Sequence, residues 1–147
     1  MKYKFIYINI LFICILMSSP VDQNKAQRVA SNIFAERSNT DSYEGFNVRS
    51  VDVIDDNNVN LLYIFQLDSE GFILVAGDDR VQPLLAYSFE SNFILEDVPT
   101  NVAWMVDAYK SMVKHAMESE RSATERINAE WEKYNTGTVL NSRNRDI

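Results

Sequence analysis

The stretch GFILVAGDDRVQPLLAYS, residues 71–88, decides the fold. Its two apolar segments, Phe72–Ala76 and the run from Leu84 onward, flank a polar corner. Short apolar runs bounded by Gly and Pro predict β-strands, and a connection this short permits only an antiparallel pair. Glycine gives a tight turn its free backbone, and acidic and arginine side chains can bond to turn amides and to each other. We therefore interpret the polar cluster between these strands as a structural corner, which consists of Gly77, Asp78, Asp79 and Arg80.

Further strands are predicted on both sides of this stretch. Arg49–Ile54 and Leu61–Leu67 are joined by the Asp/Asn turn at residues 55–58, whose side chains satisfy their own backbone. Leu61–Leu67 is apolar on both faces, so we expect a central strand that is covered on both sides. Leu84–Phe89 follows Pro83, which is acceptable where a strand begins. The short connections predict a four-stranded antiparallel meander.

Helical periodicity flanks the predicted strands. Asp22 is a candidate N-cap for a helix that ends near Arg37, and its apolar stripe is Ala26, Val29, Ala30, Ile33 and Phe34. A long helix follows Pro99, with Thr100 or Asn101 as its N-cap. Its apolar stripe is predicted to face the core and consists of Val102, Met105, Val106, Tyr109, Met112, Val113, Ala116 and Met117.

The end of the chain is predicted to be less ordered. A charged segment, 118–126, precedes a bent or second helix that carries Ile127, Trp131 and Tyr134 and that we expect to be less buried. Thr136-Gly137 ends it, and residues 136–147 are predicted to form a flexible tail. The fold class is α+β: a four-stranded antiparallel sheet packed by an N-terminal helix and a long C-terminal helix, within a domain of residues 22–135.

Residues 1–21 are predicted to be a signal peptide. Lys2 and Lys4 precede the apolar run Phe5–Met17, which is too short to span a bilayer comfortably, and small residues follow it. We therefore expect an exported protein, periplasmic or secreted. A lipid anchor at Cys14 is disfavoured, because bulky Ile13 precedes it and the apolar run continues past it.

Charge narrows the possible partners. The net charge is -7, and without residues 1–21 it would be -9, because 12 basic residues (14 less Lys2 and Lys4) face 21 acidic ones. Such a surface repels nucleic acid and anionic lipid, so we expect no nucleic-acid partner, and no membrane contact once the signal peptide is removed. The same cut removes the single cysteine, which leaves no disulfide, thiolate ligand or cysteine nucleophile.

Catalytic patterns are missing from the sequence. His115 is the single histidine and is interpreted as a solvated helix residue, so no metal or cofactor site is predicted. There is no G-x-S-x-G turn for a serine nucleophile. Residues 55–58 lack the spacing and closing Glu of a calcium loop. Asp78 and Asp79 are adjacent and would point different ways, which makes them poor partners for acid–base catalysis.

Trp104 lies off the apolar stripe near the start of the long helix. An exposed tryptophan there is a frequent interface anchor. The alternative is that it packs under the Asn92–Asp97 loop, and the sequence leaves both possibilities open.

Taken together, GFILVAGDDRVQPLLAYS, the helix KAQRVASNIFAER and the segment VPTNVAWMVDAYKSMV resemble the pro-domain of streptopain-type cysteine peptidases and the related streptopain inhibitors (Spi). The resemblance covers roughly Asp22 to Met117. It implies a stand-alone inhibitor, not an enzyme, that binds a streptopain-type (papain-like) cysteine peptidase, blocks its cleft sterically and is a monomer when free. The partner-binding residues so implied are Pro99, Thr100, Asn101, Val102 and Trp104, with Asn101 reaching the catalytic Cys/His region.

Two alternatives stay open. The domain could act in trans as a folding helper for such a peptidase, without lasting inhibition. It could instead be an exported ligand-binding module, which predicts a deep apolar pocket between sheet and helix, whereas inhibition predicts a protruding loop near Pro99–Asn101.

Overall fold

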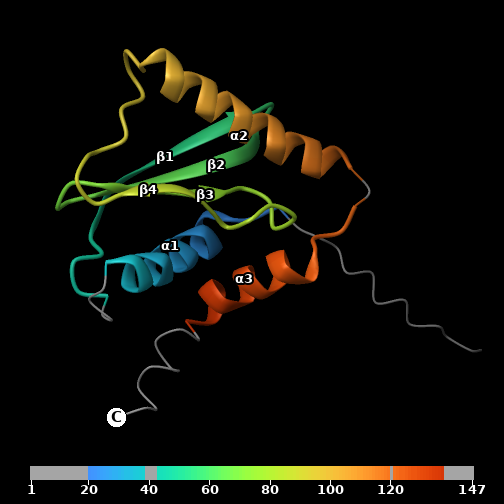
Figure 1. Cartoon of the computed structure of the whole chain (residues 1–147), viewed down its shortest axis with the longest axis horizontal. Coiled ribbons are helices and arrows are strands. Elements are labelled where there is room, and N and C mark those ends of the chain that lie inside the picture. The colour runs from blue at the N-terminus through green and yellow to red at the C-terminus, as the bar shows by residue number, and fades with distance from the viewer. Residues whose placement is uncertain (1–19, 39–42, 120, 138–147) are drawn as a thin grey trace, which may run out of the picture.

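A computed structural model describes residues 20–38, 43–119 and 121–137 (Figure 1). Within these ranges the fold is α+β, as predicted, with a four-stranded antiparallel sheet, an N-terminal helix and a long helix after the sheet. The elements in chain order are α1 (Gln23–Arg37), β1 (Val48–Asp56), β2 (Val59–Leu67), β3 (Phe72–Ala76), β4 (Leu84–Ser88), α2 (Thr100–Glu118) and α3 (Glu125–Thr136).

The sheet is a meander in the order β1-β2-β3-β4. Asn57 and Asn58 form the turn between β1 and β2 with positive φ angles of 51° and 64°, a conformation that asparagine tolerates and that suits the twist of a hairpin. β2 is central and every residue from Leu61 to Leu67 is buried, which confirms the prediction of a strand covered on both faces.

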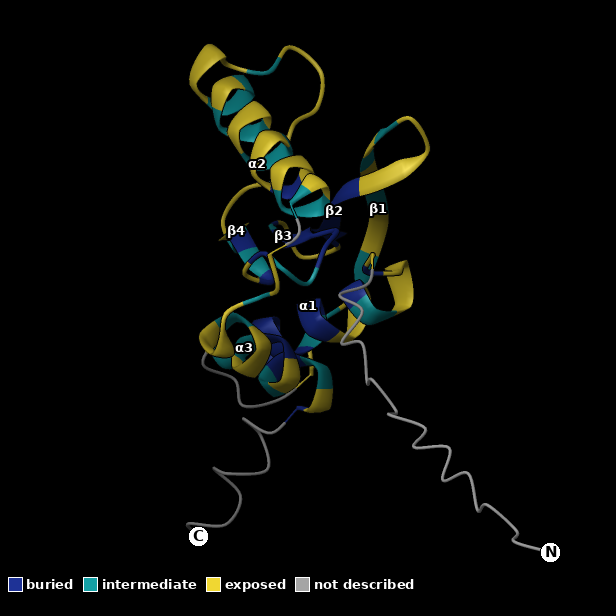
Figure 2. Cartoon of the chain, turned by 90° about the vertical axis from the view of Figure 1, so that its right-hand side faces the viewer, coloured by how far each residue is buried: buried dark blue, intermediate teal, exposed yellow. Residues whose placement is uncertain are grey.

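Helices cover the two faces of the sheet. α2 lies over one face and α1 over the other, and α3 packs on the outer side of α1 (Figures 1 and 2). The prediction that Asp22 caps α1 is confirmed, because its carboxylate accepts a hydrogen bond from the Lys25 amide at 2.8 Å. Tyr63 of β2 donates to the Val21 carbonyl at 2.7 Å, which ties the central strand to the chain just before α1.

α2 is less buried than its apolar stripe predicted. Val113 is its one fully buried residue, and Met112 is 38% exposed. The C-terminal end of α2 lies close to the sheet, whereas its N-terminal end rises away from it (Figures 1 and 2). Periodicity identified the inward face correctly, but β3 and β4 have five residues each and do not extend far beneath the helix.

The prediction that the last helix is less buried is wrong. Trp131 and Tyr134 are only 4% and 5% exposed, because they pack against the outer side of α1. The Trp131 indole donates to the Val81 carbonyl at 2.7 Å. Asn32 of α1 donates to the Tyr134 carbonyl at 2.8 Å and accepts from Tyr43. α3 is therefore part of the folded body.

The folded body begins before Asp22. Pro20 forms an isolated antiparallel β-bridge with Asp78. Val21, which is 3% exposed, donates its amide to the Gly77 carbonyl at 2.9 Å. These two residues are the last of the predicted signal peptide. The rest of that segment, 1–19, and residues 138–147 of the predicted tail lie outside the described residues, so the leader and the tail stay predictions.

The two tryptophans offer a matched test of the α3 packing. Trp131→Ala should lower the free energy of unfolding by about 3–5 kcal/mol, because it removes a buried ring and its hydrogen bond. Trp104→Ala, at a position that is 75% exposed, should change it by no more than about 0.5 kcal/mol. Urea unfolding followed by circular dichroism measures both, and equal losses would contradict the described packing.

Candidate functional site

A buried ion pair forms the corner between β3 and β4. The Asp78 side chain is fully buried, and both of its oxygens accept from Arg80, at 2.8 Å from Nε and 2.8 Å from Nη2. The Arg80 backbone amide adds a third bond to Asp78 at 3.0 Å. These hydrogen bonds from Arg80 to Asp78 raise the pKa of the guanidinium above its ordinary value. The carboxylate is therefore held by its neighbour in a two-pronged geometry and is not presented to a substrate.

Arg80 also binds the C-terminal end of α2. Its Nη1 donates to the carbonyls of Met117 and Ser119, at 3.4 Å and 3.3 Å. The last carbonyls of a helix lack partners within the helix, and a cation there also interacts favourably with the negative end of the helix dipole. The corner thus fixes where α2 ends.

Gly77 and Asp79 connect the corner to the rest of the body. A Cβ on Gly77 would lie 2.2 Å from the Asn60 carbonyl oxygen, so only glycine fits against β2 at this point. Asp79 pairs with Lys25 of α1 at 3.2 Å. Each residue of the Gly77–Arg80 corner therefore has a structural partner in a different part of the chain.

Arg80→Met should strongly destabilise the protein. It would leave the Asp78 carboxylate buried without its cation, which costs about 3–5 kcal/mol of unfolding free energy. Arg126→Met is the matched control, because Arg126 pairs with Glu130 on an exposed helix surface and should cost at most about 0.5 kcal/mol. Chemical denaturation measures both values, and a cost below 1 kcal/mol for Arg80→Met, roughly the ceiling for exposed pairs, would contradict a structural role.

A glutamine on the central strand anchors the loop that leads to α2. Gln66, 5% exposed, donates to the Phe93 carbonyl at 2.8 Å and accepts from the Phe93 amide at 3.1 Å. The Phe93 ring packs edge-on against Phe72 at 5.0 Å between centroids. The Gln66 side chain thus bonds to both backbone groups of Phe93, as the backbone of a neighbouring strand would, and holds the base of the loop. Beyond it, the residues from Ile94 to Thr100 are exposed except for half-buried Val98.

The junction segment, Pro99–Val102, begins α2 without a side-chain cap. The prediction that Thr100 or Asn101 is the N-cap is wrong, because Pro99 occupies that position and its carbonyl accepts from the amides of Val102 and Ala103. Proline cannot cap with its side chain, so the first backbone N–H groups of the helix receive no side-chain acceptor. Thr100 and Asn101 are both exposed. Their amides and side chains are available to a partner.

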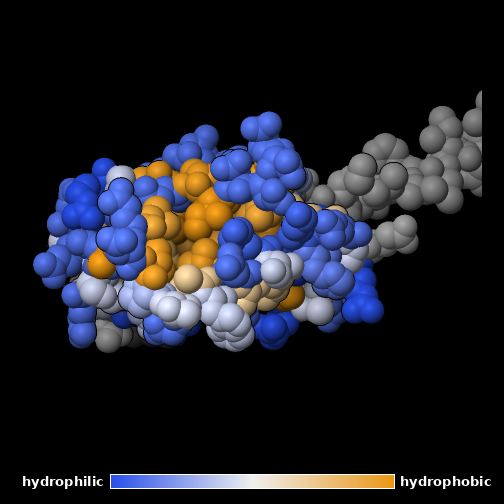
Figure 3. Space-filling model, turned by 90° about the horizontal axis from the view of Figure 1, so that it is seen from above, coloured by the Kyte–Doolittle hydropathy of each residue, from blue (hydrophilic) through white to orange (hydrophobic). Residues whose placement is uncertain are grey.

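Trp104 stands one turn further along α2 and is 75% exposed. It does not pack under the Asn92–Asp97 loop, which was the alternative that the sequence left open. Two more exposed apolar residues lie in that loop, Ile94 at 62% and Leu95 at 43%. Seen from the α2 side, apolar residues form a band bordered by hydrophilic ones (Figure 3). The structure thus presents the five predicted partner-binding residues on one segment, with Asn101 and Trp104 exposed and Val102 half-buried.

The flank of α2 that faces the β1–β2 hairpin is charged. Lys114 pairs with Asp56 at the end of β1, and Lys110 pairs with Asp107. The hydrogen bond and the charge of Lys114 lower the pKa of Asp56 below its ordinary value, and the same hydrogen bond raises the pKa of Lys114. Because the folded pKa of Asp56 is lowered, this pair stabilises the fold above the ordinary carboxyl pKa and is lost as pH falls through the lowered pKa.

Lys114→Gln should raise the pKa of Asp56 toward the ordinary value of 3.8. Lys110→Gln, one turn away on the same helix, should raise it less, because Lys110 contributes only a weaker charge effect. An NMR titration of the Asp56 side chain compares the variants. A larger shift for Lys110→Gln would contradict the described pairing.

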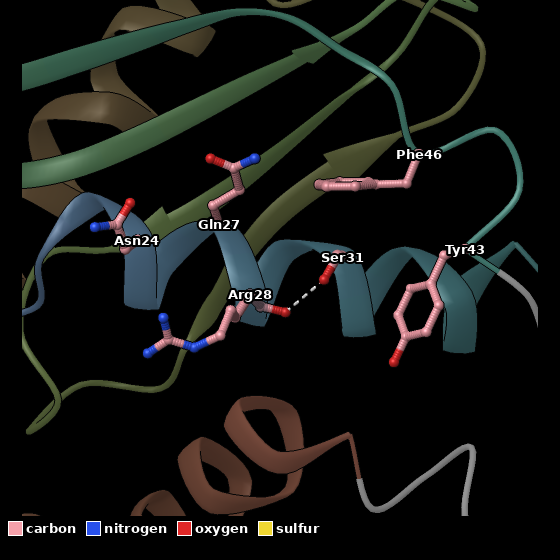
Figure 4. A pocket seen from close by; sticks show the side chains of 6 residues that line it. All are labelled: Asn24, Gln27, Arg28, Ser31, Tyr43 and Phe46. Carbon is pink, nitrogen blue, oxygen red and sulfur yellow. Dashed lines mark hydrogen bonds between the residues drawn. The ribbon is translucent and has the colours of Figure 1, made fainter.

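The described residues offer no catalytic or metal-binding arrangement. They contain no group of three His, Cys, Asp or Glu side chains close enough to hold a metal. His115 is exposed on α2. One hollow of about 580 Å³ lies beside α1 and is lined by Asn24, Gln27, Arg28, Ser31, Tyr43 and Phe46 (Figure 4). It is an open surface hollow on the α1 side of the sheet, with two amides, two hydroxyl groups and a guanidinium but no carboxylate among these residues. Among the helices of the described part, none has the length and apolarity needed to cross a membrane.

An exposed apolar anchor beside an uncapped helix start, on a body without grouped metal ligands in its described part, is typical of a protein-binding domain. The sequence profile of the Spi protease inhibitor family matches residues 18–113, and the chain belongs to that family. The family is one of protease inhibitors and not of enzymes, as predicted from the sequence. The match ends at Val113, so α3 lies beyond it.

The chain is similar to the thiol protease/hemagglutinin PrtT of Porphyromonas gingivalis. It is 29% identical over 125 residues, which is 82% of this chain and 14% of that protein. The chain therefore spans a small part of the relative that it matches. No solved structure matches the chain significantly.

Sequence reasoning missed two parts of this site. The Gln66–Phe93 anchor was not predicted, although a single polar residue within the apolar run 61–67 was a signal that a buried partner exists. The bond from Arg80 to the end of α2 was also missed, because nothing local in the sequence relates residues 80 and 117.

Proposed function

We propose that the chain is an exported inhibitor of a streptopain-type, papain-like cysteine peptidase, and that the junction segment Pro99–Val102 blocks the active-site cleft sterically. The observation that carries the proposal is the exposed junction itself: it has no side-chain cap, and it stands between two fixed points, the Phe93 anchor and the Arg80 bond at the far end of α2. The family of protease inhibitors and the thiol protease relative support this class of target.

The chemistry of Asn101 suits this role. A neutral amide both donates and accepts hydrogen bonds, so it can face a thiolate and an imidazolium together. The amide is exposed and is not used to cap the helix. Asn101 then contacts the Cys/His region of the target without presenting a bond that the peptidase cleaves.

Trp104, Ile94 and Leu95 supply the apolar area of the same contact. Aromatic anchors of this kind contribute a large share of the free energy of binding at protein interfaces. A junction that is held on both sides, at Phe93 and at the end of α2, also loses less conformational freedom on binding than an unattached loop, which favours affinity. The exposed carboxylates of Glu96 and Asp97 beside these residues favour a target with a basic rim around its cleft.

The direct test mixes the purified chain with a streptopain-type peptidase encoded beside it and measures residual peptidase activity. Stoichiometric inhibition at micromolar concentrations or below is expected. Absence of inhibition would reject the proposal. If the chain then raised the refolding yield of the denatured peptidase, the folding-helper alternative would be favoured instead.

Two substitutions locate the contact. Trp104→Ala should raise the inhibition constant about 30-fold, the equivalent of roughly 2 kcal/mol for an anchor residue, and Asn101→Ala about tenfold, as expected for a hydrogen bond to a charged group. Val59→Ala is the matched control, since Val59 is also exposed, at 41%, but lies at the start of β2. Unchanged inhibition by both α2 variants would place the interface elsewhere.

A further inference from the structure

A second hollow lies at the other end of α2, where α3 begins. It is open to solvent, has a volume of about 410 Å³ and is bordered by the C-terminal half of α2, the segment Arg80–Gln82 and the first turn of α3. Its apolar lining residues are Val81, Met112, Ala116 and Ile127. Met112 is 38% exposed, which is unusual exposure for a residue that belongs to the inward stripe by periodicity. The hollow is large enough for a bulky apolar side chain.

The polar part of this hollow contains basic side chains. Arg80, Arg121 and Arg126 line it together with His115 and several hydroxyl groups, and none of its described lining residues is Asp or Glu. Arg126 pairs with Glu130 at 2.8 Å on the outer surface of α3. Arg80 pairs with Asp78, and Arg121 adds a further guanidinium to the described lining. Such a hollow favours an apolar group that stands next to a carboxylate.

The hollow is continuous with the proposed interface. Asn101, Trp104, Ala108, Met112 and His115 recur at intervals of three or four residues and so form one exposed or half-exposed face of α2. None of these five is Asp, Glu, Lys or Arg, whereas the flank toward β1 carries the ion pairs of Asp107 and Lys114. The uncharged face leads from the junction segment directly into the hollow, which Met112 and His115 line.

The distance fits one protein partner. Fourteen residues of helix separate Asn101 from His115, a rise of about 21 Å. A standard protein interface buries about 800 Å² on each partner and is therefore roughly 30 Å across. A single protein partner of this size can contact both ends of α2 at once. A short peptide bound at the junction segment would not reach the hollow.

We propose that this hollow is a second contact with the target peptidase, and that it receives an apolar side chain of the peptidase adjacent to an Asp or Glu. This inference rests on the proposed inhibitory function and assigns a role to α3, which lies beyond the family match. The walls of α2 and α3 hold the apolar side chain, and Arg121 pairs with the neighbouring carboxylate. α3 thus completes the binding surface in addition to covering α1.

Two variants test the second contact by inhibition assays. Met112→Glu should raise the inhibition constant about tenfold or more, because it places a carboxylate against an apolar group and beside another carboxylate. Arg121→Glu should raise it several-fold, chiefly through slower association, and the effect should shrink in high salt. Arg121 lies in the connection between α2 and α3, so its variant stays informative even if Met112→Glu unfolds the protein.

Matched controls come from edge strand β1. Val53→Glu introduces the same carboxylate at a site that is 37% exposed, against 38% for Met112, and Arg49→Glu reverses a charge on the same strand. Both should stay within twofold of the parent protein. If Met112→Glu and Arg121→Glu also stay within twofold while Trp104→Ala weakens inhibition, the second contact is rejected and the proposed function stands. A parent protein that does not inhibit would overturn both.

Discussion

The buried ion pair between Asp78 and Arg80 is the constraint on which the rest of the structure depends. The Asp78 side chain has no exposure, and a carboxylate in that position is tolerated only with a cation and further hydrogen bonds around it. Arg80 meets that requirement and reaches the carbonyls at the end of α2 with its remaining nitrogen. One side chain thus joins the turn between β3 and β4 to the C-terminal end of α2.

This arrangement holds α2 at one end and leaves the other end clear of the sheet. The long helix is buried only around Val113, and its start rises with the loop that follows Phe93. Gln66 fixes the base of the loop that leads to this raised start. The helix is thus held at its C-terminal end by Arg80 and exposed at its first turn. Under the proposed function, holding both ends of the junction segment would limit the conformational freedom that it loses on binding.

Much of this fold could be predicted because the responsible signals are local. The apolar run before Gly77, the Asp22 cap and the Asn57-Asn58 turn each act within a few residues, and all three occur where expected. Features that depend on distant partners were not accessible. Periodicity showed which side of α2 faces inward but not how much sheet lies beneath it. The charged segment before α3 suggested exposure, while the burial of Trp131 depends on a surface of α1 that the sequence does not display. Pro99 displaced the expected cap because the backbone of the loop, not side-chain preference, sets where α2 begins.

The Gln66–Phe93 anchor has a consequence for how the protein diversifies. Gln66 supports this loop through the backbone of Phe93, and the Phe93 ring packs against Phe72, so the support lies at the base of the loop. Residues 94–97 are exposed and Val98 is half-buried, so none of them belongs to the core. Changes in their sequence, and even in their number, should therefore cost little free energy of folding. Selection for a new target can therefore act on these positions while the scaffold is inherited unchanged.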